Sequence, residues 1–146
     1  LRGVPARGGA LMADALEVTA TWRGGYEATV SARGHAVTID EPETAGGRDA
    51  GPMPTEALAI SIASCFCLAV AHVARRDGFA ISDLNVHARA ERAGRELRYG
   101  RVVVTTSATV DGAPLETLVE RARRVCWVSN TLAKPPALEY RSMEVP

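Results

Sequence analysis

A long uncharged stretch in the middle of the chain constrains the fold more than any other feature. No residue from Ala57 to Ala71 carries a formal charge, and Cys65 lies near the centre of this run. Pro54 stands where a first helical turn tolerates proline, because its missing N–H would have no partner there. The residues before Gly78 include two arginines, and that glycine is a natural helix stop. The sequence therefore predicts one helix of about six turns from Pro54 onward, and a helix without a polar face must be enclosed by the rest of the protein.

Alternation of apolar and polar residues before and after this helix predicts antiparallel strands. Residues 16–23, 26–30 and 37–39 are expected to form a three-stranded meander, with turns at Gly24-Gly25 and Arg33-Gly34. A loop rich in proline and glycine over residues 40–51 leads into the helix.

The second half of the chain predicts a further hairpin, a second helix and a last strand. Residues 84–90 and 102–110 alternate as a strand pair, and Pro114 opens a helix. The apolar stripe of that helix consists of Leu115, Leu118, Val119, Ala122, Val125 and Cys126. A closing strand is indicated by Leu138, Tyr140 and Met143. The expected order is βββ–α–ββ–α–β, which is an α+β fold in which a long buried helix packs on antiparallel sheets.

Length and charge limit what this chain can be. Its 146 residues are predicted to form a single domain over 16–146, after a disordered extension over 1–15 in which Met12 is a plausible start. Seventeen basic and 17 acidic side chains give a formal net charge of zero, which argues against nucleic acid as a partner. No signal peptide is expected, and the uncharged stretch is shorter than the ~20 residues that a bilayer span needs, so no membrane is expected either. Three cysteines do not make a disulfide scaffold, and a reducing, cytoplasmic setting is predicted.

The cysteines allow three interpretations. Cys65 and Cys126 lie on the apolar stripes of two different helices, so both can be small buried hydrophobic residues. Alternatively they form a redox pair, in which one thiol is oxidised to a sulfenic acid and the other condenses with it. A metal site is not expected, because Cys65, Cys67, Cys126 and His72 lack the spacing of structural zinc ligands. Cys67 points about 200° away from Cys65 on a helix and is interpreted as packing.

A reactive thiolate at Cys65 would need a positive charge nearby, because burial raises the pKa of cysteine. The N-terminus of its own helix lies about 15 Å away, beyond the reach of the helix dipole. The candidates for this cation are Arg23, Arg33 and Arg48, from the opening strands and the loop.

Four motifs together resemble the OsmC/Ohr proteins, named for osmotically inducible protein C and organic hydroperoxide resistance. They are Asp40-Glu-Pro, the run from Gly46-Gly-Arg-Asp to Pro54-Thr-Glu-Ala-Leu58, Ala63-Ser-Cys65, and Cys126-Trp-Val-Ser-Asn-Thr-Leu132. The expected order of elements agrees with that family from Leu16 to the C-terminus, so the resemblance covers nearly the whole chain.

The resemblance implies a thiol-dependent peroxidase that reduces organic hydroperoxides to alcohols, built as an intertwined homodimer without a cofactor. By position, Cys65 would be the attacking thiol and Cys126 the resolving thiol, with a dithiol such as a lipoyl group as reductant. Arg23 aligns with the activating arginine, and Glu56 is the nearest candidate for the carboxylate that holds it.

The chain departs from the peroxidase branches of the family at two positions. Those branches place a glutamate directly after the proline, where this chain has Thr55, and commonly a proline after the second cysteine, where it has Trp127. The sequence therefore resembles the broader OsmC-like branch. These departures motivate an alternative function, a non-enzymatic module that binds small molecules or senses redox state.

Overall fold

A computed structural model describes residues 15–145. The chain divides into two compact units, Leu1–Pro54 and Thr55–Pro146, and each is described here by itself. Apart from Ala15, the extension predicted over residues 1–15 lies outside the described residues, as does the proposed start at Met12.

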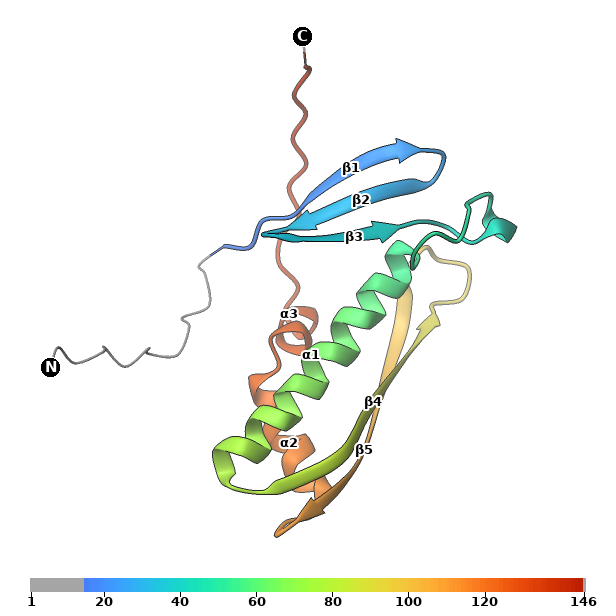
Figure 1. Ribbon diagram of the computed structural model, residues 1–146. Coiled ribbons are helices and arrows are strands. Elements are labelled where there is room, and N and C mark those ends of the chain that lie inside the picture. Colours follow the sequence, from blue (N-terminus) through green and yellow to red (C-terminus); the bar gives the residue numbers. More distant parts are fainter. Residues whose placement is uncertain (1–14, 146) are drawn as a thin grey trace, which may run out of the picture. The chain divides into compact units, whose positions relative to one another are not determined.

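The first unit is an antiparallel sheet of three strands, as the sequence predicts. Strands β1 (Thr19–Gly24), β2 (Glu27–Ala32) and β3 (His35–Ile39) lie side by side in chain order (Figure 1). The register pairs Trp22 with Ala28 and Val30 with Val37. The apolar side of β1 is nevertheless open, since Trp22 is 73% exposed. This sheet alone therefore cannot bury the apolar side chains of its own alternating pattern.

The loop after β3 is shaped by one buried carboxylate. Asp40, 1% exposed, accepts hydrogen bonds from the backbone N–H groups of Glu41, Arg48 and Ala50 at 2.8, 3.0 and 3.2 Å. Burial raises the pKa of Asp40, but these donors outweigh burial and hold the pKa below its usual value. Two glycines complete the loop: a Cβ at Gly47 would lie 1.8 Å from the carbonyl oxygen of Glu41, and one at Gly51 only 2.1 Å from that of Thr38.

The second unit contains the long helix and everything after it. Helix α1 (Pro54–Asp77) leads into the hairpin of β4 (Ala80–Arg92) and β5 (Tyr99–Asp111). Helix α2 (Leu115–Val125) and the short helix α3 (Trp127–Ala133) follow (Figure 1). The core of the unit is formed by Phe66, Ala69, Val70, Val73, Ala74, Leu118, Ala122 and Cys126. It lies between α1 and α2, with apolar residues of β4 and β5 packed against it.

An ion-pair cluster joins the end of α1 to α2. The carboxylate of Asp77 contacts Arg76 at 2.7 Å and Arg121 at 2.5 Å. These two guanidinium groups, Arg76 first, lower the pKa of Asp77 to about 2. Arg76 and Asp77 thus end α1 and also fasten it to the neighbouring helix.

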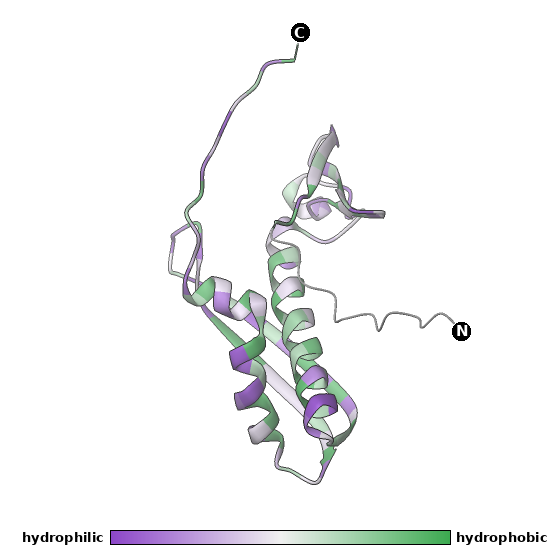
Figure 2. Ribbon diagram, turned by 90° about the vertical axis from the view of Figure 1, so that its left-hand side faces the viewer, coloured by the Kyte–Doolittle hydropathy of each residue, from purple (hydrophilic) through white to green (hydrophobic). Residues whose placement is uncertain are grey.

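The sequence predicts that α1 is enclosed on all sides, and the single chain does not enclose it. Its buried residues are Ile62, Phe66, Ala69, Val70, Val73 and Ala74, which occupy one side. Ile60 and Leu68, on the opposite side, are 53% and 70% exposed. Apart from Glu56 in the first turn, the charged residues of the helix lie in its last turns (Figure 2). The hairpin and α2 cover one side of α1, so an uncharged side remains open.

Among the described residues, α1 is the one helix long and apolar enough to cross a bilayer. Length and apolar composition do not by themselves identify a membrane span, because the core helix of a soluble protein has both. Here the packing of α1 against the hairpin and α2 gives its apolar residues another role.

The end of the chain also differs from the sequence prediction. The predicted order holds through α2, but α3 follows and residues 135–145 form no strand. Leu138, Tyr140 and Met143 are 76%, 90% and 92% exposed. A strand needs a neighbouring edge to pair its N–H and C=O groups, and this segment pairs with none among the described residues. The prediction of a closing strand is therefore wrong for the single chain.

Candidate active site

The fold brings two cysteines together that are 61 positions apart in the sequence. Cys65 lies in the middle of α1, and Cys126 lies between α2 and α3. Their sulfur atoms are 3.5 Å apart, with the thiol of Cys126 donating toward Cys65 Sγ. Both thiols are free. The arrangement needs only a small side-chain movement to reach the length of about 2.05 Å at which two sulfurs are bonded.

The two thiols differ in their exposure to solvent. Cys126 is fully buried, because it continues the stripe of Leu118 and Ala122 at a spacing of four residues. Cys65 is only partly buried. A reagent from solvent can therefore reach Cys65 before it can reach Cys126.

A break in the helix at Cys126 supplies hydrogen-bond donors to Cys65. The backbone of Cys126 is extended (φ −78°, ψ 108°), which ends α2 and lets α3 begin at Trp127. The first N–H groups of a helix have no partner within it. Those of Val128 and Trp127 act on the sulfur of Cys65 and lower its pKa. No residue pattern predicts this break, because the apolar stripe of α2 runs through Cys126 without interruption.

Opposing influences act on the ionisation of Cys65. Burial raises the pKa of the Cys65 thiol most strongly, the N–H of Val128 lowers it, the neighbouring Cys126 raises it, and the N–H of Trp127 lowers it. The net result is a pKa above the ordinary value. None of these influences comes from a basic side chain, so within its own unit Cys65 is held mainly as the neutral thiol.

Ser129 is a member of the site that the sequence analysis did not identify. Its hydroxyl donates to Cys126 Sγ at 3.1 Å, from one turn into α3. A hydroxyl in this position can stabilise negative charge on the sulfur when Cys126 ionises. The sequence signal for this contact is the Cys-x-x-Ser spacing at the start of a helix, because it places the serine side chain next to the cysteine that precedes the helix.

Cys67 lies outside the thiol pair. Cys67 lies on α1 and is free, and no hydrogen bond joins it to the other two cysteines. Within residues 15–145 no group of three or more His, Cys, Asp or Glu side chains is arranged to hold a metal ion.

The arginines predicted as activators belong to a different unit from the thiols. Arg23, Arg33 and Arg48 belong to the first unit and Cys65 to the second. There, Arg23 Nε donates to Thr29 Oγ1 at 3.0 Å, and Arg48 forms an ion pair with Glu27.

Arg33 occupies the turn between β2 and β3 with a positive φ of 56°. Glu56 is exposed in the first turn of α1, nine residues before Cys65 and nearly opposite to it around the helix. The second unit therefore brings Cys65 and Cys126 together, whereas Glu56 of the same unit faces away from Cys65.

Comparison with known proteins identifies the family. Residues 46–141 match the family described as OsmC-like protein, and the chain belongs to this family. No curated protein sequence matches the chain.

Solved structures share the fold. An OsmC-like protein from Mycoplasma pneumoniae aligns with a TM-score of 0.74 at 16% identity, over 85% of this chain and 91% of that one. An organic hydroperoxide resistance protein OsmC from Legionella pneumophila aligns at 0.62 and 23% identity, over 84% and 91%. One from Elizabethkingia anophelis aligns at 0.60 and 24%, over 85% and 91%. At such identities these likenesses establish the α+β, OsmC-like fold and not the activity.

Proposed function

We propose that this protein is a thiol-dependent peroxidase that reduces organic hydroperoxides to alcohols. The thiolate of Cys65 attacks the distal oxygen of the hydroperoxide, the O–O bond breaks, and the alkoxide leaves as the alcohol after taking up a proton. Cys65 is then a sulfenic acid. The sulfur of Cys126 attacks it, water leaves and a disulfide forms, which an external dithiol such as a lipoyl group reduces.

The single observation that carries this proposal is the distance of 3.5 Å between the two sulfurs. Two cysteines with only a packing role have no reason to face each other across two helices. The difference in exposure agrees with the division of roles, since the accessible Cys65 meets the substrate and the buried Cys126 meets only the oxidised Cys65. The family includes proteins named for organic hydroperoxide resistance, which supports the same chemistry.

Cys65 must ionise for this reaction, and its raised pKa has to be offset. The N–H groups of Val128 and Trp127 lower the pKa and so supply part of this offset. They act on the sulfur whose charge changes during the reaction. For the remainder we propose Arg23 as the activating guanidinium and Glu56 as the carboxylate that orients it. Arg23→Gln should then raise the pKa of Cys65, measured as the midpoint of its alkylation rate against pH.

We further propose that the protein is an intertwined homodimer. The open side of α1 carries Ile60, Ser64 and Leu68 and no charge, and the open side of the first sheet carries Trp22. Exposed apolar surface of this kind on two units is typical of an interface between permanently associated chains. Sedimentation should show a dimer for the wild type and a smaller species for Leu68→Glu. A monomeric wild type would refute this part.

The decisive experiment follows the loss of cumene hydroperoxide with dihydrolipoate as reductant. Cys65→Ser should abolish turnover, and Cys126→Ser should leave a first turnover but stop the cycle. Cys67→Ser is the matched control on the same helix and should keep the wild-type rate. Unchanged turnover in Cys65→Ser would reject the mechanism. We expect the reaction to take place in a reducing, cytoplasmic setting.

A second function, binding or redox sensing without turnover, is favoured by one observation. The main influences on Cys65 include no basic side chain and leave its pKa raised. A sensor would show no steady turnover with dihydrolipoate, but ligands that bind the folded state would raise its melting temperature.

A further inference from the structure

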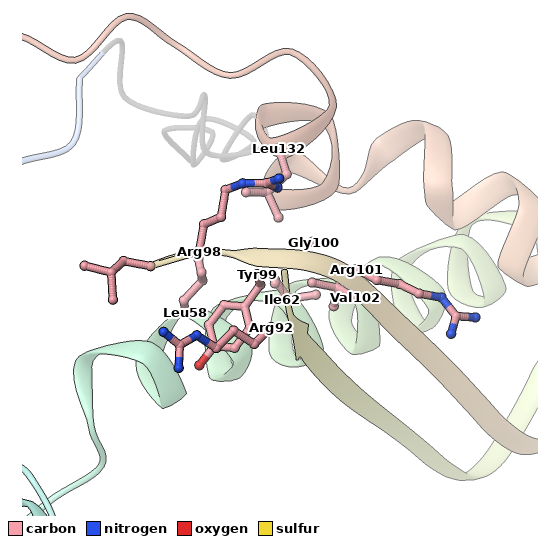
Figure 3. A pocket seen from close by; sticks show the side chains of 10 residues that line it. Leu58, Ile62, Arg92, Arg98, Tyr99, Gly100, Arg101, Val102 and Leu132 are labelled. Atoms are coloured by element: carbon pink, nitrogen blue, oxygen red, sulfur yellow. The ribbon is translucent and has the colours of Figure 1, made fainter. Parts of the chain in front are cut away.

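A cavity of about 600 Å³ opens in the second unit against the first turns of α1. Its floor is formed by Leu58 and Ile62 of α1, and Val102 of β5 and Leu132 of α3 contribute further apolar surface (Figure 3). Leu58 and Ile62 precede Cys65 by seven and three residues and therefore share its side of the helix. The nearer of the two is one turn away, about 4.5 Å along the axis. This side differs from the uncharged side that we assign to the dimer.

The rim of the cavity is strongly basic, although the chain as a whole is neutral. Residues 89–101 contain five arginines and two glutamates, a net charge of +3. Arg92, Arg98 and Arg101 are among the residues that line the cavity. Arg101 points away along β5, whereas Arg98 reaches toward Leu132 (Figure 3).

Of the three arginines that line the cavity, Arg92 is the one without a carboxylate partner among the described residues. It donates from Nε to the backbone oxygen of Glu96 at 2.8 Å, and from one Nη to that of Arg95 at 3.1 Å. Arg98, in contrast, is paired with the Glu96 carboxylate at 2.6 Å, and Arg101 with Glu91 at 3.4 Å. The two carbonyls orient the guanidinium of Arg92 without neutralising it. Its second Nη group makes no hydrogen bond within the described chain.

We propose that this cavity binds an apolar chain ending in an oxyanion, a carboxylate or a phosphate. The aliphatic part lies over Leu58 and Ile62, and the oxyanion is held by Arg92. An arginine already oriented by carbonyls suits such a group, because its planar fork can donate two parallel hydrogen bonds. The volume is in the range of small-molecule sites.

The test is calorimetric titration of the full chain with decanoate, decyl phosphate and decanol. At low salt we expect at least one of the two anions to bind roughly tenfold more tightly than decanol, which has the same chain without the charge. High salt should weaken the anions and not decanol. The stronger of the two anions identifies the preferred headgroup.

Variants locate the interaction. Arg92→Gln should weaken anion binding roughly tenfold and leave decanol unchanged, whereas Arg92→Lys keeps the charge but not the two parallel hydrogen bonds and should lie between Arg92→Gln and the wild type. Arg89→Gln is the matched control, because Arg89 is on the same strand but does not line the cavity.

The outcomes that would overturn the proposal do not depend on the redox chemistry of the cysteines. Binding of neither anion, or binding of decanol as tight as that of decanoate, overturns it. An Arg92→Gln protein that binds the anions as tightly as Arg89→Gln does also overturns it. If Arg92→Gln does not fold, the proposal is overturned when salt has no effect on anion binding by the wild type. A Cys65→Ser protein should still bind decanoate, so loss of turnover leaves this result untouched.

Discussion

Oxidation of the Cys65–Cys126 pair should stabilise the protein strongly. One equivalent of hydroperoxide is expected to convert the two thiols into a disulfide, because their sulfurs are already 3.5 Å apart. The bond would close a loop of about 61 positions and so restrict the unfolded chain.

The magnitude follows from the length of that loop. For a closed loop of about 60 residues, the chain-entropy relation gives about 4 kcal/mol at 25 °C. In a chain of this size each kcal/mol raises Tm by about 3 °C, so the oxidised protein should melt roughly 12 °C higher than the reduced one. Any strain needed to bring the sulfurs together lowers this figure.

The assay is thermal unfolding of reduced and oxidised samples, with the loss of two hydrogens confirmed by mass spectrometry. Cys67→Ser should show the same increase in Tm as the wild type, and Cys126→Ser should show none. A disulfide that forms between Cys65 and Cys126 and leaves Tm unchanged or lower would refute the reasoning. The two sulfurs could not then be neighbours in an unstrained folded unit.

Three further predictions concern the structure around the site. Leu118→Ala removes a fully buried side chain and should lower the free energy of unfolding, measured in urea, by roughly 2–5 kcal/mol. Leu97→Ala, at a residue that is 98% exposed, should change it by less than about 0.5 kcal/mol. Equal effects would contradict the core described above. The pKa of Asp77 is depressed to about 2 from 3.8, so its ion pairs stabilise the fold above about pH 4 and are lost as the pH falls toward 2. Asp77→Asn should lose less Tm than the wild type in that window, since Asp40 still takes up a proton there, and a loss as large as that of the wild type would exclude this role. Ser129→Ala should slow closure of the disulfide roughly three- to tenfold without slowing oxidation of Cys65. The oxidation step is measured by trapping the sulfenic acid with dimedone. Equal slowing of both steps would indicate a purely structural serine.

Local patterns predicted most of the elements, because each depends on neighbours in the sequence. The alternation over residues 16–39 gave the meander, and the stripe from Leu115 to Val125 gave α2. The closing strand failed for a physical reason: Leu138 and Tyr140 have the right spacing, but a strand also needs a partner edge, which spacing does not report.

The candidate site was predictable in its residue types and not in its geometry. Both thiols were identified from their apolar stripes, but a separation of 61 positions says nothing about distance. The donors from Val128 and Trp127 depend on a single extended residue at Cys126. No residue pattern in α2 marks that change of backbone direction. The basic cavity was also missed, because a neutral total charge hides five arginines in one hairpin.

The loop held by Asp40 has a practical consequence for engineering this protein. Its glycines and prolines suggest a permissive connection, yet Gly47 and Gly51 have no room for even a methyl group. A spectroscopic label or affinity tag placed there would dismantle the connection. Gly34 offers the opposite case: its φ is not in the left-handed region, and a Cβ there would meet no heavy atom within 4 Å. A cysteine for fluorophore attachment belongs at that turn.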